Sequence, residues 1–148
     1  IIRAALKGVK VHIRNPGAVR PWQHVLEPLS GYLVLAEALY RRGTCYAGAW
    51  NFGPAAPGAK DVEWVVKRMF QKWPDAPGYK IDRGRHPHEA RFLSLDSSKA
   101  RLRLGWRPCW SVGEAVDRTI EWTLAYKNSE DAREICLRQI TAYDALRP

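Results

Sequence analysis

The sequence predicts an α/β fold in which several helices surround small, mixed β elements. Two patterns lead to this prediction. Valine and isoleucine alternate with polar residues over 9–13, the period of two that is typical of a strand with one buried face. Apolar residues recur at helical spacing over 27–42, 62–73 and 112–123. A length of 148 residues, 46% hydrophobic and 26% charged, fits one soluble globular domain.

The first part of the chain is expected to contain a helix, a strand and a longer helix. Residues 1–6 are apolar, begin with isoleucine and lack a helix-start signal, so we expect a helix already under way in a piece of a longer protein. The strand at 9–13 ends at the turn Asn15-Pro16-Gly17. The helix over 27–42 is expected to stop at Gly43.

The middle of the chain is expected to hold a short strand over 49–52, followed by a loop rich in proline and glycine. Asp61 is placed to cap a helix over 62–73, which Pro74 ends. A further short strand is predicted around 79–82.

The last part of the chain is expected to be extended over 90–95 and then helical. Asp96 is a plausible N-cap for a short helix that ends at Gly105, with Trp106 packing beyond the stop. Residues 111–114 have the spacing of a capping box and open the helix over 112–123. A final helix is expected at about 130–145.

Charge, hydropathy and cysteine spacing narrow the class of protein. There are 24 Lys and Arg against 15 Asp and Glu, a net charge of +9. No apolar run reaches the roughly 18 residues of a membrane span, so a cytoplasmic protein without a membrane partner is expected. Cys45, Cys109 and Cys136 are far apart and odd in number, which favours reduced thiols used in packing over disulfides or a zinc site.

Two motifs of dinucleotide-dependent enzymes are missing. The chain contains no Gly-x-Gly-x-x-Gly, the turn that brings a pyrophosphate onto a helix N-terminus. None of the six tyrosines has a lysine four residues later, so an acid/base pair of that spacing is also missing. We therefore expect that this chain alone binds no NAD.

Two polar segments are candidate sites. Residues 20–25 (Arg-Pro-Trp-Gln-His-Val) could place the Arg20 guanidinium on two phosphate oxygens, or could stack it on Trp22 with nothing bound, and the residues alone leave both open. Residues 86–89 (His-Pro-His-Glu) could bind a metal, but too few ligands lie near in sequence, which favours a polar loop or a contact with an anion or hydroxyl. No metal is therefore expected.

The stretch RNPGAVRPWQHVLEPLSGY over 14–32 resembles the CDP-glucose 4,6-dehydratases, members of the extended short-chain dehydrogenase/reductase family. WNFG at 50–53, DSSKA at 96–100 and LGWRP at 104–108 are similar to later parts of the same family, in the same order. The resemblance is to the C-terminal, nucleotide-sugar-binding part only. It implies one substrate domain over 1–148, without the N-terminal NAD-binding Rossmann domain.

The resemblance also implies roles for particular residues. Arg20 matches an arginine that contacts the nucleotide-sugar diphosphate, and the preceding strand passes the nucleotide base. Relatives often carry an Arg-x-Gly-Asp-like segment whose basic residue meets phosphate and whose acid meets ribose, where this chain has RHPHE at 85–89. The substrate-binding residues implied are His12, Ile13, Arg14, Arg20, Asn51, His86 and Glu89, with none catalytic.

The family activity implied is a lyase reaction of deoxysugar biosynthesis, such as that for lipopolysaccharide O-antigen, in which NAD bound by the missing lobe helps convert CDP-glucose to CDP-4-keto-6-deoxyglucose. The implied partners are the CDP-sugar, the NAD-binding lobe of the same polypeptide and further copies of the intact enzyme. Two other classes remain open: a basic nucleic-acid-binding module, disfavoured because the cations are spread along the chain, and a non-catalytic interaction domain.

Overall fold

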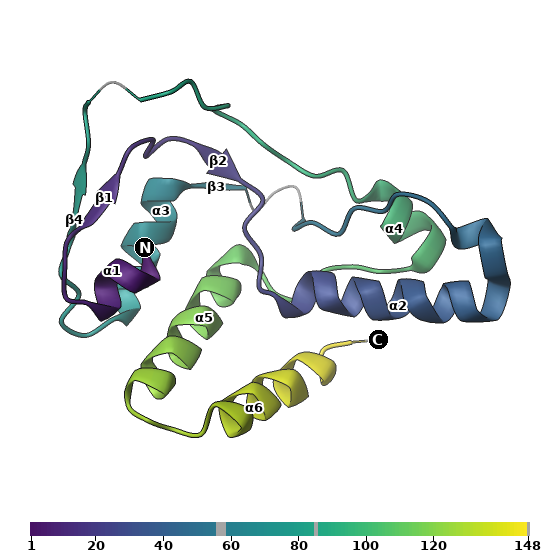
Figure 1. Ribbon diagram of the computed structural model, residues 1–148. Coiled ribbons are helices and arrows are strands. Elements are labelled where there is room, and N and C mark those ends of the chain that lie inside the picture. The colour runs from purple at the N-terminus through teal and green to yellow at the C-terminus, as the bar shows by residue number, and fades with distance from the viewer. Residues whose placement is uncertain (56–58, 85, 148) are drawn as a thin grey trace.

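The computed structural model describes residues 1–55, 59–84 and 86–147 and has an α/β fold of helices around two small sheets (Figure 1). The α/β prediction is therefore confirmed. The helices are α1 (Ile2–Leu6), α2 (Leu26–Arg42), the 3₁₀ helix η1 (Gly43–Tyr46), α3 (Val62–Lys72), α4 (Ser98–Leu104), α5 (Val112–Lys127) and α6 (Ala132–Asp144). The strands are β1 (Val11–Ile13), β2 (Val19–Arg20), β3 (Lys60–Asp61) and β4 (Tyr79–Ile81).

β1 and β4 form a parallel pair in which His12 lies opposite Lys80. The alternation predicted the burial of Val11 and Ile13 correctly, since each is 4% exposed and the His12 side chain between them faces solvent. It was wrong for Val9, which is 52% exposed and lies before the strand. Val11 and Ile13 pack against Val66 of α3, so one face of this sheet is covered by a helix.

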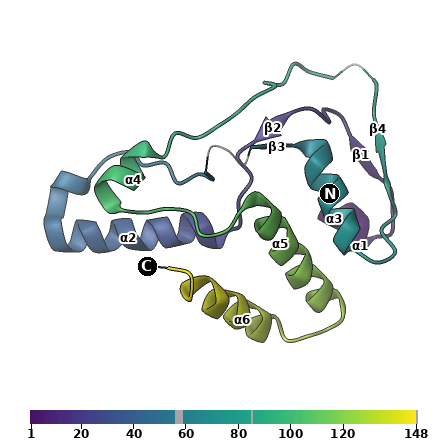
Figure 2. The same ribbon diagram turned by 180° about the vertical axis from the view of Figure 1, so that it is seen from behind.

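β2 lies between two other segments that are distant in sequence. It pairs antiparallel with β3, with Arg20 opposite Lys60. On its other side Val19 forms a parallel bridge with Phe92, which agrees with the extended conformation expected over 90–95. Figures 1 and 2 show the 86–97 segment crossing the molecule toward α4 on the outside of these strands.

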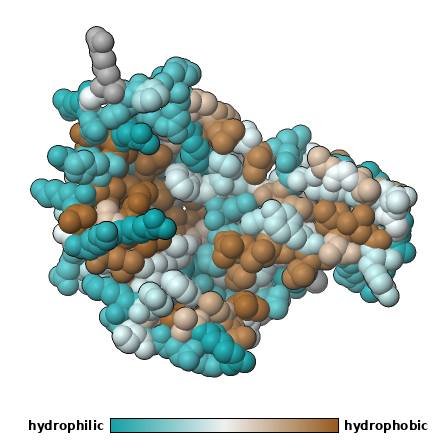
Figure 3. All heavy atoms as spheres, in the orientation of Figure 1, coloured by the Kyte–Doolittle hydropathy of each residue, from teal (hydrophilic) through white to brown (hydrophobic). Residues whose placement is uncertain are grey.

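α2 ends where the sequence predicted, because Gly43 adopts a φ of 63° that favours glycine. Its apolar stripe is exposed, however. The exposed fractions reach 66% at Leu33 and 93% at Tyr40, and hydrophobic atoms gather along α2 on the face shown in Figure 3. The side of α2 that is buried carries Glu27, Ser30 and Gly31 instead.

The strand predicted over 49–52 is wrong, since these residues pair with no strand in the described part of the chain. Isolated extended backbone does not make a sheet without a neighbour to share its hydrogen bonds. The segment is held by side chains instead: Phe52 is buried with Ala100 and Trp106 in a small core between α2 and α4.

The larger core lies between α3 and α5, and both helices start at the predicted caps. Asp61 accepts the Trp64 amide at 2.7 Å. Ser111 and Glu114 form the complete capping box. The buried residues of this core are Ala5, Val65, Met69, Trp73, Val116 and Ile120.

α4 and α6 also follow the prediction closely. Asp96 accepts the Ser98 amide at 2.8 Å, although the N-cap position itself is taken by Ser97. Gly105 ends α4 with a φ of 68°, and Trp106 beyond it is buried, as predicted. α6 lies within the expected range of 130–145.

The three cysteines are free thiols. Their predicted role in packing is wrong for Cys45 and Cys136, which are exposed, while Cys109 is half-buried. Within the described ranges, no helix is long and apolar enough to cross a membrane.

Candidate functional site

Hydrogen bonds of the Arg20 guanidinium fix this side chain beside β2. Nη1 donates to the Val19 carbonyl at 2.7 Å, and Nη2 donates to the Glu89 carboxylate. The Arg20 side chain is 19% exposed and that of Glu89 is 48% exposed. The sequence predicted both as substrate-binding residues, and the structure joins them across 69 positions of sequence.

Asn15 completes a three-residue group with Arg20 and Glu89. Asn15 Nδ2 donates to Glu89 Oε2 at 2.6 Å. This bond first, and then the Arg20 guanidinium, hold the pKa of Glu89 below its ordinary value. Arg14 lies close enough to act in the same direction and is exposed. The result is an ionised carboxylate that fixes an arginine at the protein surface.

Trp22 does not stack on Arg20. Its indole Nε1 donates to the Lys60 carbonyl at 3.0 Å, and its ring packs against the α3–α5 core. The alternative in which Arg20 merely covers Trp22 is thus not what the structure contains.

His12 and His86 both lie near Asp82, which directly follows β4. The Gly84 amide lowers the pKa of Asp82 most, followed by smaller contributions from the two histidines. His86 Nε2 is 3.4 Å from Asp82 Oδ2, but it is buried and makes no aligned hydrogen bond. Arg85, which precedes His86 in the predicted motif, lies outside the described residues.

Ile13 and Asn51 have contacts of a different kind. The Ile13 side chain belongs to the core, and its carbonyl accepts the Asp82 amide at 2.8 Å, so only its backbone borders this surface. Asn51 Nδ2 donates to the Asp96 carbonyl at 3.2 Å and takes no part in the hydrogen bonds around Arg20 or His86. The predicted residues therefore form two neighbouring groups, with Asn51 outside both.

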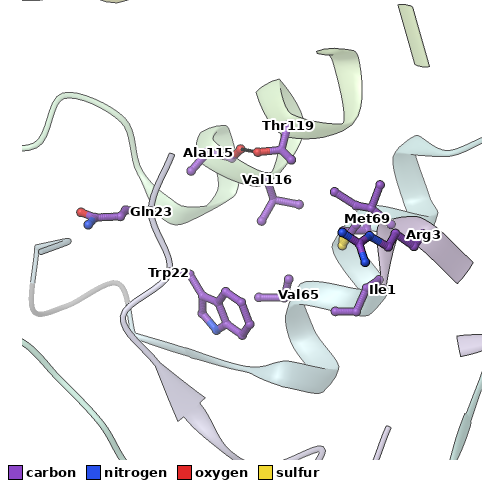
Figure 4. Close-up of a pocket in the computed structure, with 10 residues that line it drawn as sticks. Ile1, Arg3, Trp22, Gln23, Val65, Met69, Ala115, Val116 and Thr119 are labelled. Carbon is purple, nitrogen blue, oxygen red and sulfur yellow. Dashed lines mark hydrogen bonds between the residues drawn. The ribbon is translucent and has the colours of Figure 1, made fainter. Parts of the chain in front are cut away.

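Two apolar hollows lie beside this region. The first has a volume of about 480 Å³ and is bordered by Trp22, Val65, Met69 and Val116, which point into it from three segments (Figure 4). The second has a volume of about 630 Å³. Gln23 and Thr119 line both, so the two hollows are adjacent along one side of α5. Their linings suit apolar side chains better than a phosphate.

A buried polar network was missed by sequence reasoning. The Glu27 side chain is fully buried and accepts the amides of Cys109 and Trp110, the latter at 2.7 Å, and the Tyr143 hydroxyl at 2.7 Å. Burial first raises the pKa of Tyr143 above its ordinary value, and the Glu27 carboxylate raises it further. The available signal was an acidic residue in the first turn of a helix, which by itself indicates only a favourable helix dipole.

His24, the histidine of the 20–25 segment, is also structural. It is 7% exposed, and its ring meets the Trp110 ring edge-on with the centroids 4.8 Å apart. Burial lowers the pKa of His24 below its ordinary value, which favours the neutral imidazole. Among the residues that the structure describes, no three His, Cys, Asp or Glu side chains form a group that could hold a metal.

No family model matches this chain. It is 45% identical over 143 residues to a CDP-glucose 4,6-dehydratase of Salmonella typhimurium. The match covers 97% of this chain and 40% of that enzyme, so the chain spans two fifths of the length of the curated relative.

Solved structures of nucleotide-sugar enzymes share the fold. A UDP-glucose 4-epimerase of Thermotoga maritima, solved with UDP-glucose, aligns with a TM-score of 0.60 and 25% identity over 81% of this chain and 36% of its own. A UDP-N-acetylglucosamine 4-epimerase of Bacillus cereus aligns with a TM-score of 0.63 and 17% identity, over 82% of this chain and 40% of its own. A dTDP-glucose 4,6-dehydratase of Bacillus anthracis, solved with NAD, aligns with a TM-score of 0.59 and 20% identity, over 82% of this chain and 36% of its own.

The expected resemblance is thus found in sequence and in fold. Over nearly its whole length this chain is similar to part of a CDP-glucose 4,6-dehydratase, and its α/β fold is that of the matching parts of the solved sugar epimerases and dehydratase.

Proposed function

We propose that this chain is the C-terminal, nucleotide-sugar-binding part of an NAD-dependent CDP-glucose 4,6-dehydratase, a lyase that converts CDP-glucose to CDP-4-keto-6-deoxyglucose. The observation that carries this proposal is the group of Arg20, Glu89 and Asn15, in which a guanidinium is fixed at the surface within a chain 45% identical to such an enzyme. A fixed arginine fork suits two phosphate oxygens.

In this proposal Arg20 binds the diphosphate of the CDP-sugar, and Glu89 takes the ribose hydroxyls. The nucleotide base lies along β1, where His12 is exposed and Arg14 adds positive charge, and Ile13 contributes by positioning its two neighbours. His86 contacts the phosphate or ribose from the Asp82 side. Asn51 lines the far end of the site, nearest to the start of α4.

NAD does not fit the residues of this chain. In the described ranges, neither of the parallel strands β1 and β4 leads through a glycine-rich turn into a helix N-terminus, which is the arrangement that holds a pyrophosphate. We therefore assign NAD, the redox chemistry it supplies and the acid/base groups to a separate Rossmann lobe of the intact enzyme. On this assignment residues 1–148 form a single substrate domain that has no activity alone.

The proposed NAD-binding lobe needs a surface to pack on, and the exposed apolar residues supply one. The two hollows beside α5 continue onto α2 through Leu29, and α2 then carries the exposed Leu33 and Tyr40. Large exposed apolar patches mark interaction surfaces. We propose in addition that the intact enzyme is a cytoplasmic oligomer that supplies deoxysugars, such as those of lipopolysaccharide O-antigen.

The test is a titration of this chain with CDP and CDP-glucose. A charge-assisted contact of a guanidinium with a diphosphate contributes about 1.5–3 kcal/mol, so Arg20→Ala should weaken binding by roughly one to two orders of magnitude. Arg20→Lys should recover only part of the affinity, because lysine presents a single point of charge instead of a fork. Thermal melts of the same variants serve as the stability control.

Two results would contradict the proposal. One is unchanged CDP affinity in Arg20→Ala. The other is binding of DNA or RNA that tightens with oligonucleotide length and is indifferent to CDP, which would indicate a nucleic-acid module. Formation of a 4-keto sugar by the pure chain would separately overturn the assignment of catalysis to another lobe.

A further inference from the structure

A small cavity of about 220 Å³ lies between the C-terminal end of α2 and α4, away from the Arg20 group. Its polar lining is Glu37, Arg41, Arg42, Tyr46 and Arg103. α2 has 17 residues and is therefore about 25 Å long. Arg20 lies in β2, before the N-terminal end of α2 (Figure 1), and Arg42 is the last residue of this helix. The cavity and the proposed CDP-sugar site therefore lie at opposite ends of α2.

Two of the arginines of this cavity pack against the ring of Tyr46. Its side chain is buried, and the guanidinium carbons of Arg42 and Arg103 lie 6.0 and 5.3 Å from the centre of its ring. Arg42 Nη1 donates to the Tyr46 hydroxyl at 3.1 Å, and Arg103 Nη2 donates to the Cys45 carbonyl at 2.9 Å. Each guanidinium has five N–H groups, so each keeps donors for a further acceptor.

Lys99 extends the cluster along the stacked ring of Trp50. The Tyr46 and Trp50 rings are 13° from parallel with their centroids 6.0 Å apart, and Lys99 Nζ lies 4.2 Å from the Trp50 centroid. Arg103 lies 5.8 Å from the same centroid. The aromatic pair therefore brings cations from α2 and from α4 to one place.

The positive charge here is only partly neutralised. Glu37 pairs with Arg41 at 2.7 Å, whereas Arg42, Lys99 and Arg103 have no carboxylate within 4.0 Å in the described part of the chain. The C-terminal ends of α2 and α4 each offset roughly half a charge. The three arginines that line the cavity, set against one carboxylate and two helix ends, leave a charge of about +1, to which the nearby Lys99 adds.

We propose that this α2–α4 cavity is a second anion site, which binds the phosphate group of a small molecule. A phosphate monoester carries a charge of about −1.5 to −2 at neutral pH, opposite in sign to the uncompensated charge of these arginines and Lys99. Arginine forks suit its oxygens. A volume of about 220 Å³ is below the roughly 300–1,000 Å³ of sites for drug-sized ligands, so this hollow holds a phosphate group, and the rest of a small ester would extend into solvent.

The probes are inorganic phosphate and a hexose monophosphate, titrated separately into this chain at constant ionic strength. The Trp50 indole N–H, which donates to the Tyr46 carbonyl at 2.9 Å, gives a local NMR signal that Trp50→Phe identifies. We expect this signal to shift and saturate with one or both probes. Tighter binding of the ester would identify it as the ligand, and equal binding would identify free phosphate.

The variant pair Arg42→Gln with Arg103→Gln should weaken the saturable shift at least tenfold. The matched control is Arg133→Gln with Arg138→Gln, which removes the same charge from exposed arginines of α6 and should leave binding unchanged. Arg42→Gln alone keeps the Arg103 contact with Cys45, so it carries the test if the double variant does not fold. Arg20→Ala separates the two sites, because it should reduce CDP affinity and leave the Trp50 shift intact.

Several results would overturn the second site. A Trp50 shift that fails to saturate, or that weakens equally in the control pair, would show general charge screening. A shift that disappears in Arg20→Ala would show binding at the CDP-sugar site instead. Binding of an acidic peptide without any response to phosphate would assign this surface to a protein partner.

Discussion

The Tyr143 hydroxyl donates a 2.7 Å hydrogen bond to the Glu27 carboxylate across 116 positions of sequence, and both side chains are buried. The same carboxylate accepts the amides of Cys109 and Trp110. One side chain in the first turn of α2 therefore fixes α6 and the segment between α4 and α5.

Replacing Glu27 should strongly destabilise the domain. Glu27→Ala leaves two buried amides and a buried hydroxyl without their acceptor, so the free energy of unfolding should fall by about 3 kcal/mol or more. Tyr143→Phe removes one donor and should lower it by only about 1–2 kcal/mol. Urea denaturation measures both, and similar losses in the two variants would contradict a central role for the carboxylate.

The raised pKa of Tyr143 also leads us to expect a loss of stability at alkaline pH. Its pKa is raised in the folded protein, mainly by burial, while in the unfolded chain it stays near 10. The stabilisation is complete below the unfolded pKa and is lost as the pH rises above it, because only the unfolded chain then releases the proton. Thermal melts from pH 8 to 11 should show a decline that is smaller in Tyr143→Phe.

If Arg20 binds a diphosphate as proposed, the bound phosphates and Glu89 must share its guanidinium. Glu89→Gln keeps an oxygen for Asn15 and for a ribose hydroxyl but removes a negative charge beside the proposed phosphates, so CDP affinity should rise severalfold. Pyrophosphate, which has no ribose, should gain at least as much. A tenfold loss of affinity for both ligands would instead show that the charge is needed to position Arg20.

The same ion pair makes the Arg20 group sensitive to acid. The pKa of Glu89 is lowered in the folded protein, first by Asn15 and then by Arg20. The contribution of this carboxylate to stability is therefore present above its unfolded pKa, near 4.5, and is lost as the pH falls through the lower folded value. Melts between pH 6 and 3 should decline less steeply in Glu89→Gln than in the wild type.

Gly31 should resist substitution although it lies inside a helix. A Cβ built there would overlap the Phe52 ring, so Gly31→Ala should destabilise by about 1–3 kcal/mol despite its better helix propensity. Gly17→Ala is the control, since nothing lies within 4 Å of its Cβ position. Adding Phe52→Leu to Gly31→Ala replaces the ring with a smaller side chain, so the double variant should recover part of the lost stability.

Local signals in the sequence predicted the helix boundaries well. The Asp61 cap, the Ser111 and Glu114 box and the Gly105 stop each depend on a few neighbouring residues, and the structure confirms all three. The strand at 49–52 failed because a strand needs a neighbour, which the local sequence does not specify.

The candidate site was only partly predictable for the same reason. Arg20 and Glu89 were identified through a resemblance. Their contact and the role of Asn15 depend on two segments that meet although they lie 69 or more residues apart in the sequence. Glu27 carried no local signal of burial, since its partners lie 82 to 116 positions away. The exposed stripe of α2 likewise has the spacing of a buried one.

Because Tyr143 follows Glu27 by 116 residues, we expect the contact between them to form late during synthesis. Helix α2 leaves the ribosome early, but its buried carboxylate lacks its tyrosine partner until residue 143 has been made. The contact closes a long loop, which slows folding compared with local contacts. We therefore expect nascent chains that stop before α6 to remain sensitive to protease around α2, and protection to arise only when α6 is free to dock.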